Sequence, residues 1–218
     1  MSDERDTRLP LAPWLQRQLD SLLSQRGHAW LLQGPSGSGK SSLFRALAGL
    51  WPYAQGSITQ PADVMFIPQK PYLPNGRLRD ALAYPEVASR YDDAQLREAL
   101  AQALLPHLGD ALDQEDAWSQ KLSGGEQQRL ALARVFLKQP AWVMADEATS
   151  ALDEASEQLI YQRLLALTQR RGGGLVSIAH RPALAAFHDH RWQLEPLPGP
   201  GREFRLVSAA AEAAQSTP

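Results

Sequence analysis

The sequence contains no cysteine among its 218 residues. This absence excludes disulfide bonds and thiolate metal sites, and it suits a reducing compartment. The chain also lacks any stretch approaching the roughly 18 consecutive apolar residues of a membrane-spanning helix. Residues 1–6 carry too many charges to begin a secretory signal. We therefore expect any membrane attachment to come from a partner or from sequence outside this chain.

An excess of basic residues is lacking as well. Lysine and arginine total 22 against 24 acidic residues, which gives a formal net charge of −2. This balance argues against a broad nucleic-acid footprint, so no nucleic-acid partner is expected. A hydrophobic content of 44% with 21% charged residues is ordinary for one globular unit with a substantial core.

A glycine-rich segment has the spacing of a phosphate-binding loop, Gly34-x-x-x-x-Gly39-Lys40-Ser41. The apolar run 29–32 before it reads as a buried strand, and residues 41–48 after it have helical periodicity. A flexible linker with a chance lysine is the alternative, and this context disfavours it. Oriented amides would hold the phosphates, Lys40 would reach the β- and γ-phosphates, and Ser41 would ligate Mg²⁺. The residues expected to bind nucleotide here are Gly34, Pro35, Ser36, Gly37, Ser38, Gly39, Lys40, Ser41 and Ser42.

An acidic pair, Asp146 and Glu147, ends a second apolar run at residues 141–145. Adjacent acids are usually a solvated turn or a helix cap, but open α/β sheets place ligands at the carboxyl ends of their strands. At such an edge Asp146 would hold Mg²⁺ through water. Glu147 would orient or deprotonate the water that attacks the phosphate.

A third segment, Ser123-Gly124-Gly125-Glu126, opens an expected helix over residues 127–138. The amides at its start form a second anion-binding terminus. The two glycines allow the backbone to approach a phosphate closely, and Ser123 can donate a hydroxyl hydrogen bond.

These three segments, in this order, resemble the nucleotide-binding domain of an ATP-binding cassette (ABC) protein, from about residue 34 to about 194. The resemblance implies a P-loop NTPase of the α/β class, with a RecA-like core. The alternation of expected strands and helices independently favours a parallel sheet with helices on both faces. We expect one ABC ATPase domain over 1–218: core at about 10–69 and 134–207, inserted helical subdomain at about 70–133, and a frayed tail over 208–218.

The resemblance also assigns roles to single residues. Gln69 matches the family's glutamine that senses Mg²⁺ and water, so the expected metal set is Ser41, Gln69 and Asp146. His180 matches a histidine that contacts the γ-phosphate, so Glu147, His180 and Lys40 form the expected catalytic set. A lone histidine after a strand is more often structural, and a lone glutamine before Lys70-Pro71 ordinarily marks a surface loop. The remaining residues expected to contact nucleotide are Gln69, Ser123, Gly124, Gly125, Glu126 and Asp153.

The partners implied by the resemblance are a second copy and a membrane domain. In this family the Ser123 segment caps the nucleotide held by the opposite subunit, so two copies would enclose two ATP molecules head to tail. Residues 68–73 and 76–80 look like the coupling region of exporter-type cassettes. Residues 50–53 and 116–118 are similar to peroxisomal fatty-acyl transporters and their bacterial relatives, although Trp51 and Trp118 suit packing anchors better than ligand contacts. We expect a permease domain, fused or separate, that holds this chain at the cytoplasmic side of an inner membrane.

Two other functions are alternatives to transport. A soluble ABC ATPase acting on DNA ends or ribosomes usually has a coiled-coil insertion or tandem cassettes, and the sequence shows neither. A regulatory module that binds ATP without hydrolysis is disfavoured by the presence of Glu147 and His180. The transported molecule is left open among peptides, lipids, acyl-CoA esters and vitamins.

The front of the chain departs from the family pattern. Relatives carry an antiparallel segment with an aromatic residue that stacks on adenine, whereas leucines 15, 19, 22 and 23 here have helix-like spacing. Trp14 offers an aromatic face, but a tryptophan beside Pro13 is more often simply packed. The residue that recognises the base is therefore not assigned.

Overall fold

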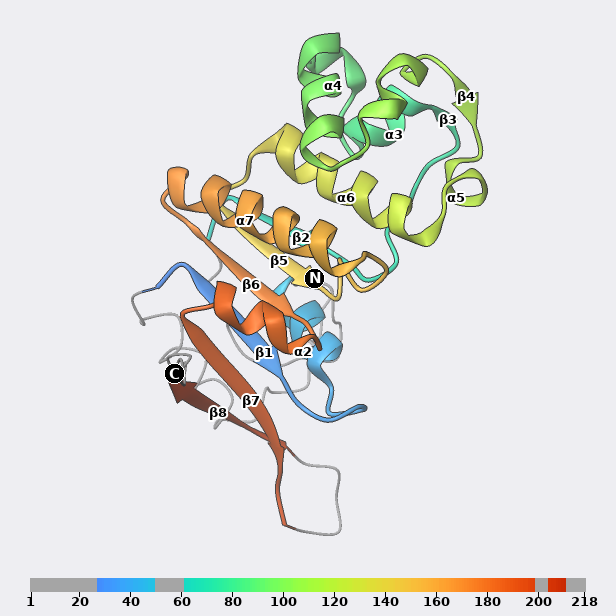
Figure 1. Ribbon diagram of the computed structural model, residues 1–218. Coiled ribbons are helices and arrows are strands. Elements are labelled where there is room, and N and C mark those ends of the chain that lie inside the picture. The colour runs from blue at the N-terminus through green and yellow to red at the C-terminus, as the bar shows by residue number, and fades with distance from the viewer. Residues whose placement is uncertain (1–26, 50–60, 199–203, 211–218) are drawn as a thin grey trace, which may run out of the picture.

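The computed structural model describes residues 27–49, 61–198 and 204–210. A six-stranded sheet organises this part of the chain, in the order β2-β5-β6-β1-β7-β8 (Figure 1). The first five strands in this order are parallel, and β8 pairs with β7 in antiparallel orientation. The strands are β1 (Ala29–Gln33), β2 (Val64–Ile67), β5 (Trp142–Asp146), β6 (Gly174–Ile178), β7 (His190–Pro196) and β8 (Phe204–Ala210).

Helices cover both faces of this sheet. Side chains alternate between the faces of a strand, so Trp30 and Leu32 of β1 contribute to one core and Leu31 to the other. Helix α2 (Lys40–Leu47) packs on the first face through Phe44 and Leu47. Helix α7 (Glu154–Arg170) lies across β5 and β6 on the second face, and its residues Ile160, Tyr161, Leu164 and Leu167 are buried there (Figure 1). Burial on both faces explains why the central strands are continuous apolar runs.

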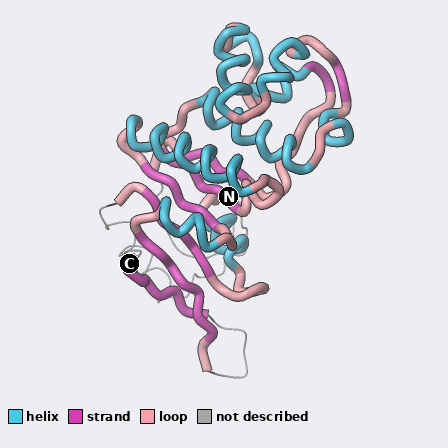
Figure 2. Tube along the Cα trace, viewed as in Figure 1, coloured by secondary structure: helices cyan, strands magenta, loops and turns pink. Residues whose placement is uncertain are grey.

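A helical region follows β2 and gathers beyond one edge of the sheet (Figure 2). Its fully buried Trp118 donates from Nε1 to the carbonyl oxygen of Gly76 at 2.8 Å, which confirms that Trp118 is a packing anchor. The region contains β3 (Gly76–Arg77), α3 (Leu78–Ala83), η1 (Ala88–Arg90), α4 (Asp93–Gln102), η2 (Pro106–Ala111), β4 (Glu115–Asp116), α5 (Trp118–Lys121) and α6 (Gly124–Lys138).

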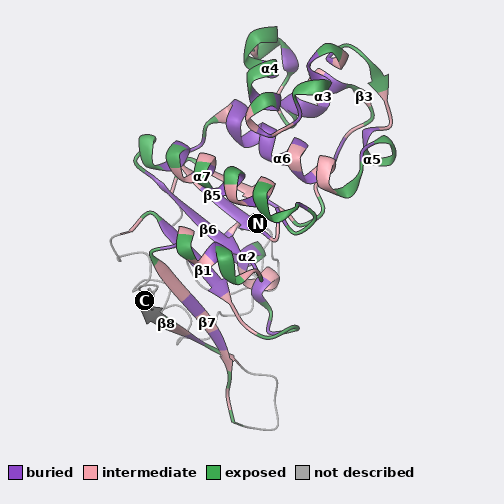
Figure 3. Cartoon of the chain, in the orientation of Figure 1, coloured by how far each residue is buried: buried purple, intermediate pink, exposed green. Residues whose placement is uncertain are grey.

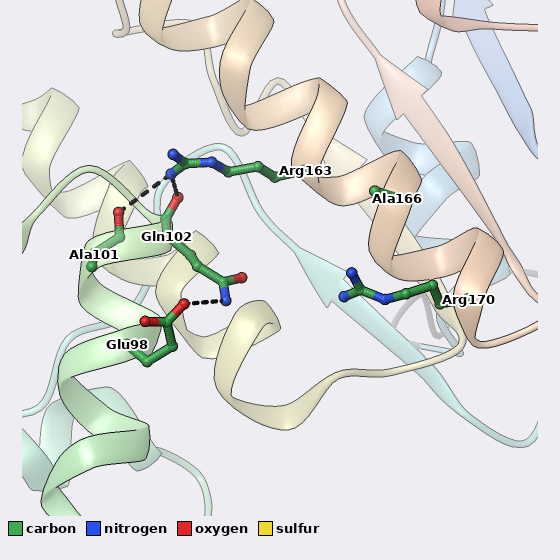
Figure 4. Close-up of a pocket in the computed structure, with 6 residues that line it drawn as sticks. All are labelled: Glu98, Ala101, Gln102, Arg163, Ala166 and Arg170. Atoms are coloured by element: carbon green, nitrogen blue, oxygen red, sulfur yellow. Dashed lines mark hydrogen bonds between the residues drawn. The ribbon is translucent and has the colours of Figure 1, made fainter.

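Helix α6, which is buried along much of its length (Figure 3), and a contact from α7 are among the connections between the helical region and the rest of the fold. Helix α6 runs without interruption through residue 133, where we expected the subdomain to end. On the other side, Arg163 of α7 donates to the carbonyl oxygens of Ala101 and Gln102 at the end of α4 (Figure 4). The cavity between α4 and α7 measures about 400 Å³, and its lining includes Arg163 and Arg170. It lies apart from the residues expected to bind nucleotide.

Three consecutive glycines lie at the start of β6, where the backbone closely approaches the residues that precede β5 and β1. A Cβ atom on Gly173 would lie 1.9 Å from the carbonyl oxygen of Ala141, and one on Gly174 would lie 2.8 Å from that of His28. Such contacts are incompatible with any side chain. This close approach accompanies a register in which Gly174 stands opposite Trp142 and Ile178 opposite Asp146.

The strand expected over residues 29–32 lies within β1, and the apolar run at 141–145 corresponds to β5, which starts and ends one residue later. The helix expected over 127–138 begins earlier, at Gly124. The frayed tail was expected to start at Ser208, but residues 208–210 are paired with β7 because β8 continues to Ala210. Residues 211–218, Trp51, Trp14 and the leucines from 15 to 23 lie outside the described residues. Within the described ranges, no helix is long and apolar enough to cross a membrane.

Candidate nucleotide-binding site

The glycine-rich loop joins β1 to α2, as its sequence context predicted. Gly37 and Gly39 have φ values of +75° and +84°, in the left-handed region that favours glycine. Gly39 is the N-cap of α2, and this helix start has no side-chain cap hydrogen bond. The first amides of α2 are therefore available to an anion, and the helix dipole favours negative charge there.

Lys40 is folded over this loop. Its Nζ donates to the carbonyl oxygens of Gly34 at 2.8 Å and Pro35 at 3.0 Å, and the residue is 7% exposed. Burial lowers the pKa of Lys40, while the nearby carboxylates of Glu147 and Asp146 act in the opposite direction. The ammonium group thus lies in the loop beside two acids, where it can neutralise phosphate charge.

A cavity of about 330 Å³ opens beside the loop. Glu147 and His180 contribute to its wall from loops that follow β5 and β6. The structure thereby brings three separately predicted segments to one place, since strands β1, β5 and β6 are neighbours in the sheet. The cavity is lined by Ser36, Gly37, Ser38, Gly39, Lys40, Ser41, Ser42, Glu147 and His180.

Two of the three residues expected to bind Mg²⁺, Ser41 and Asp146, are hydrogen-bonded to each other. Ser41 Oγ donates to Asp146 Oδ1 at 3.0 Å, although the residues are 105 positions apart. Asp146 is 3% exposed, and burial raises its pKa against the opposing effect of the Ser41 hydrogen bond. No cluster of three or more His, Cys, Asp or Glu residues forms a metal site within the described chain. One hydroxyl and one carboxylate nevertheless fit Mg²⁺, which commonly takes few protein oxygens and completes its shell with water and phosphate.

Glu147 is held on both sides of its carboxylate. Gln69 Nε2 donates to Oε2 at 2.7 Å, and His180 Nε2 lies 2.8 Å from Oε1. The backbone of Glu147 has φ of +49°, which is uncommon for a residue with a side chain, and its amide donates to the carbonyl oxygen of Ile178 at 3.0 Å. The carboxylate is therefore aimed by its main chain and by two side chains, all of which place it at the cavity.

Gln128 is a buried contact that the sequence analysis did not single out. Its Nε2 lies 3.2 Å from the carbonyl oxygen of Gln69 and 3.3 Å from that of Glu147, and its Oε1 accepts from the amide of Ala151 at 2.9 Å. One amide side chain on α6 thus ties together the backbones of the two loops that carry Gln69 and Glu147. The sequence signal that could have identified Gln128 is its position about one turn into the helix that follows Ser123.

The Ser123 segment has a different environment from the phosphate loop. Ser123 caps α6 in a reciprocal arrangement with Glu126, whose pKa is lowered by the side-chain hydrogen bond from Ser123. A Cβ atom on Gly125 would lie 3.1 Å from the carbonyl oxygen of Ala151. Residues 123–126 are not among the described residues that line the cavity. In a single chain, therefore, the start of α6 does not meet the start of α2 at that cavity.

Asp153 also lies outside the lining of the cavity. It caps α7, with its Oδ1 accepting from the amide of Ser156 at 2.9 Å. The Ser156 hydrogen bond lowers the pKa of Asp153. The structure thus gives this residue a capping role within its own chain.

A second network missed by the sequence analysis lies behind Glu147. Glu157 of α7, which is 3% exposed, accepts from Thr149 Oγ1 at 2.6 Å and from Arg181 Nη1 at 2.9 Å. Arg181 Nη2 also donates to the carbonyl oxygen of Leu152 at 2.7 Å. Since Arg181 follows His180 directly, these contacts reach the main chain of a candidate catalytic residue.

The chain is similar to ABC transporter proteins. Residues 20–150 match the family model described as ABC transporter. An uncharacterized ABC transporter ATP-binding protein of Synechocystis is 47% identical over 81% of this chain and 28% of that protein. ABC transporter D family member 1 of Arabidopsis thaliana is 38% identical over 78% of this chain and 13% of that protein.

Among solved structures, a bacterial Atm1-family ABC exporter with ATP bound matches with a TM-score of 0.63 and 30% identity. The match covers 78% of this chain and 32% of the exporter chain. This chain thus spans less than a third of each of the three proteins. The D family match and the exporter match agree with the branch that the sequence motifs indicated. The chain belongs to the ABC transporter family, as its ATP-binding domain, the part that in this family hydrolyses ATP.

Proposed function

We propose that two copies of this chain close head to tail on ATP and drive a permease domain, fused or separate, at the cytoplasmic side of an inner membrane. The observation that carries the proposal is the position of Glu147 at the phosphate-loop cavity, between Gln69 and His180. A carboxylate with a neighbouring imidazole is suited to orienting or deprotonating a water molecule. ATP binding would close the dimer, and hydrolysis would reopen it.

Each side chain has a role in this reaction. The amides of the loop and Lys40 would bind the phosphates, while Ser41, Asp146 and Gln69 would hold Mg²⁺, Gln69 as the residue that senses the metal and water. The metal would neutralise charge on the β- and γ-phosphates. Glu147 would accept a proton from, or orient, the attacking water. His180 would keep the carboxylate in place and contact the γ-phosphate.

The head-to-tail dimer is supported by the separation of the two anion-binding termini. The helix start at Ser123 has two glycines and an exposed N-cap, yet it does not line the cavity of its own chain. A second copy would bring its Ser123, Gly124, Gly125 and Glu126 to the phosphates held by the first. Asp153 would lie at the contact between the copies.

The permease contact is assigned to the exposed aromatic residues of the segment that resembles a coupling region. Tyr72 and Tyr84 are 62% and 40% exposed, and their rings meet edge to face with centroids 5.2 Å apart. Exposed apolar side chains of this kind suit a protein interface.

The names of the relatives favour transport over a soluble ATPase of DNA repair or translation.

The experiment that tests this function compares the parent with Glu147→Gln in ATP turnover and in molar mass with ATP. We expect the parent to hydrolyse ATP and Glu147→Gln to lose at least about 100-fold in turnover while it binds ATP and accumulates as a dimer. Glu154→Gln, an exposed acid in the first turn of α7, is the matched control and should behave as the parent. Parental turnover by Glu147→Gln would contradict the assignment.

A further inference from the structure

Removing the Glu157 carboxylate from water costs free energy, so we ask which property of the fold its hydrogen bonds provide. The Glu157 carboxylate is removed from water, and its two oxygens accept from Thr149 and from Arg181. Its partner Arg181 is less buried, with a side chain that is 39% exposed. Exposed ion pairs contribute little to stability, and buried ones are often no better than apolar residues, so this pair is weak support for stability alone. What the pair fixes is geometry, because a guanidinium group presents its donors in a rigid fork.

The fork of Arg181 joins two loops at the catalytic edge of the sheet. One arm reaches Glu157 at 2.9 Å and the other reaches the carbonyl oxygen of Leu152 at 2.7 Å. Leu152 belongs to the loop that follows Glu147, whereas Arg181 belongs to the loop that follows β6. A cavity of about 130 Å³ lies between these loops, and Glu147, Glu157, His180 and Arg181 all contribute to its wall.

The position of the His180 side chain depends on these Arg181 contacts more than the position of Glu147 does. Its side chain is 58% exposed, compared with 20% for Glu147. Within the described part of the chain, the bond to Glu147 is the one hydrogen bond of its ring. Packing therefore restrains the imidazole weakly, and its position is determined by the main chain that Arg181 holds.

We propose that Arg181 and Glu157 are positioning residues that keep His180 Nε2 against Glu147. The inference rests on the proposed function, in which this pair handles the attacking water. Neither Arg181 nor Glu157 is among the described residues that line the phosphate-loop cavity. They act through His180. Substitution of Arg181 should therefore have little effect on hydrolysis once His180 has been removed.

The test is a double-mutant cycle of Arg181→Met and His180→Ala in the full chain, with single-turnover ATP hydrolysis as readout. Arg181→Met alone should lower the rate of hydrolysis about 10- to 100-fold, with KM for ATP changed less than about 2-fold, because small misplacements are costly in rate. In the His180→Ala background the same change should have less than about a 2-fold effect, because both act as one unit. A parental rate for Arg181→Met, or an equal loss in both backgrounds, would overturn the proposal.

Arg170→Met is the matched control, since it removes an exposed arginine from the end of α7, and it should keep the parental rate. Should Arg181→Met not fold, Arg181→Lys takes its place in the same cycle. Lysine keeps the positive charge near Glu157, but one ammonium group lacks the fork that serves both acceptors. We expect Arg181→Lys to lower the rate of hydrolysis less than Arg181→Met does, and to have no effect in the His180→Ala background.

A nucleotide-free measurement separates this inference from the proposed function. The ring signals of His180 are identified by NMR from the spectrum of His180→Ala. In Arg181→Met and in Glu157→Gln these signals should shift or broaden, while those of His28, at the amino end of β1, stay in place. Unchanged His180 signals in both variants would overturn the positioning role, whether or not the parent hydrolyses ATP.

Discussion

His180 Nε2 lies 2.8 Å from Glu147 Oε1, although the two residues are 33 positions apart. They meet because β5 and β6 are adjacent parallel strands in which Asp146 stands opposite Ile178. Each catalytic candidate follows its strand by one or two residues. The contact is therefore a property of sheet register.

His180→Ala should lower ATP turnover by about 100- to 1,000-fold, because it removes a group that positions the catalytic carboxylate. ATP affinity should change little, since the loop amides and Lys40 are retained. Turnover and equilibrium binding of ATP are the two measurements. His28→Ala, the same change at the amino end of β1, should leave both unaltered, and a similar loss in that control would point to general damage.

Lys40→Ala should weaken ATP binding by about 10- to 100-fold, as expected for loss of a charged hydrogen bond to phosphate. Isothermal titration with ATP measures the effect. Lys121→Ala removes a surface lysine that pairs with Asp116, and it serves as the control with unchanged affinity. Equal ATP affinity in Lys40→Ala and the parent would contradict the placement of phosphates in the loop.

A mixture of Lys40→Ala and Ser123→Arg chains tests the head-to-tail dimer. Each variant alone should be inactive, because both sites of its own dimer carry a defect. A mixed dimer would combine an intact phosphate loop from one chain with an intact Ser123 segment from the other. At equal amounts, about a quarter of parental turnover is expected from random pairing. A mixture no more active than its components would argue against shared sites.

Arg134→Met should destabilise the helical region. The buried guanidinium donates to the carbonyl oxygens of Ala81, at 2.7 and 3.0 Å, and Tyr72, at 2.9 Å, and burial lowers the pKa of Arg134 to about 10. Leaving these acceptors unpaired should cost about 2–3 kcal/mol of unfolding free energy. Urea denaturation measures it, with the exposed Arg90→Met as the neutral control. Equal midpoints for both variants would refute this account.

His188 makes stability depend on pH. Its Nδ1 donates to the carbonyl oxygen of Leu184 at 2.7 Å, and burial lowers its pKa from 6.5 to about 4. Above pH 6.5 the ring is neutral in both folded and unfolded chains, so it contributes nothing. Between pH 6.5 and about 4 the unfolded chain binds a proton that the folded chain does not, so stability falls as pH falls. The full loss is at most about 3 kcal/mol.

The measurement is the unfolding free energy of the parent and His188→Asn at pH 7 and pH 4.5. Asparagine can keep a donor for the Leu184 carbonyl and does not titrate in this range. The variant should lose less stability than the parent on acidification. Parallel losses in the two proteins would show that other groups account for the acid sensitivity.

Much of this site could be predicted because its signals are local. The phosphate loop is one continuous segment, and the strands around it are short apolar runs. The Ser41–Asp146 pair followed from a general rule, since parallel strands deliver their carboxyl ends to one edge. The roles of Asp146 and Glu147 within the reaction came from the family resemblance together with the chemistry of hydrolysis.

The contacts behind the site could not be predicted in this way. Glu157 follows Glu154 and Ser156 in a polar stretch that reads as a solvated helix face, yet it is buried by Arg181 and Thr149 from other segments. Gln128 lies between two less buried residues in the same manner. Burial of a polar side chain depends on partners distant in the sequence, and no periodicity reports them.

The close packing of the backbone at Gly173 has a consequence for catalysis. This residue lies at the amino end of β6, against the carbonyl oxygen of Ala141, while His180 lies past the other end of the strand. Any side chain at 173 would push the start of β6 away from β5. The distance between the strands, which lets His180 reach Glu147, thus depends on the lack of a Cβ atom on Gly173 at the other end of β6. Loss of hydrolysis in this protein can originate there, in a residue with no functional group at all.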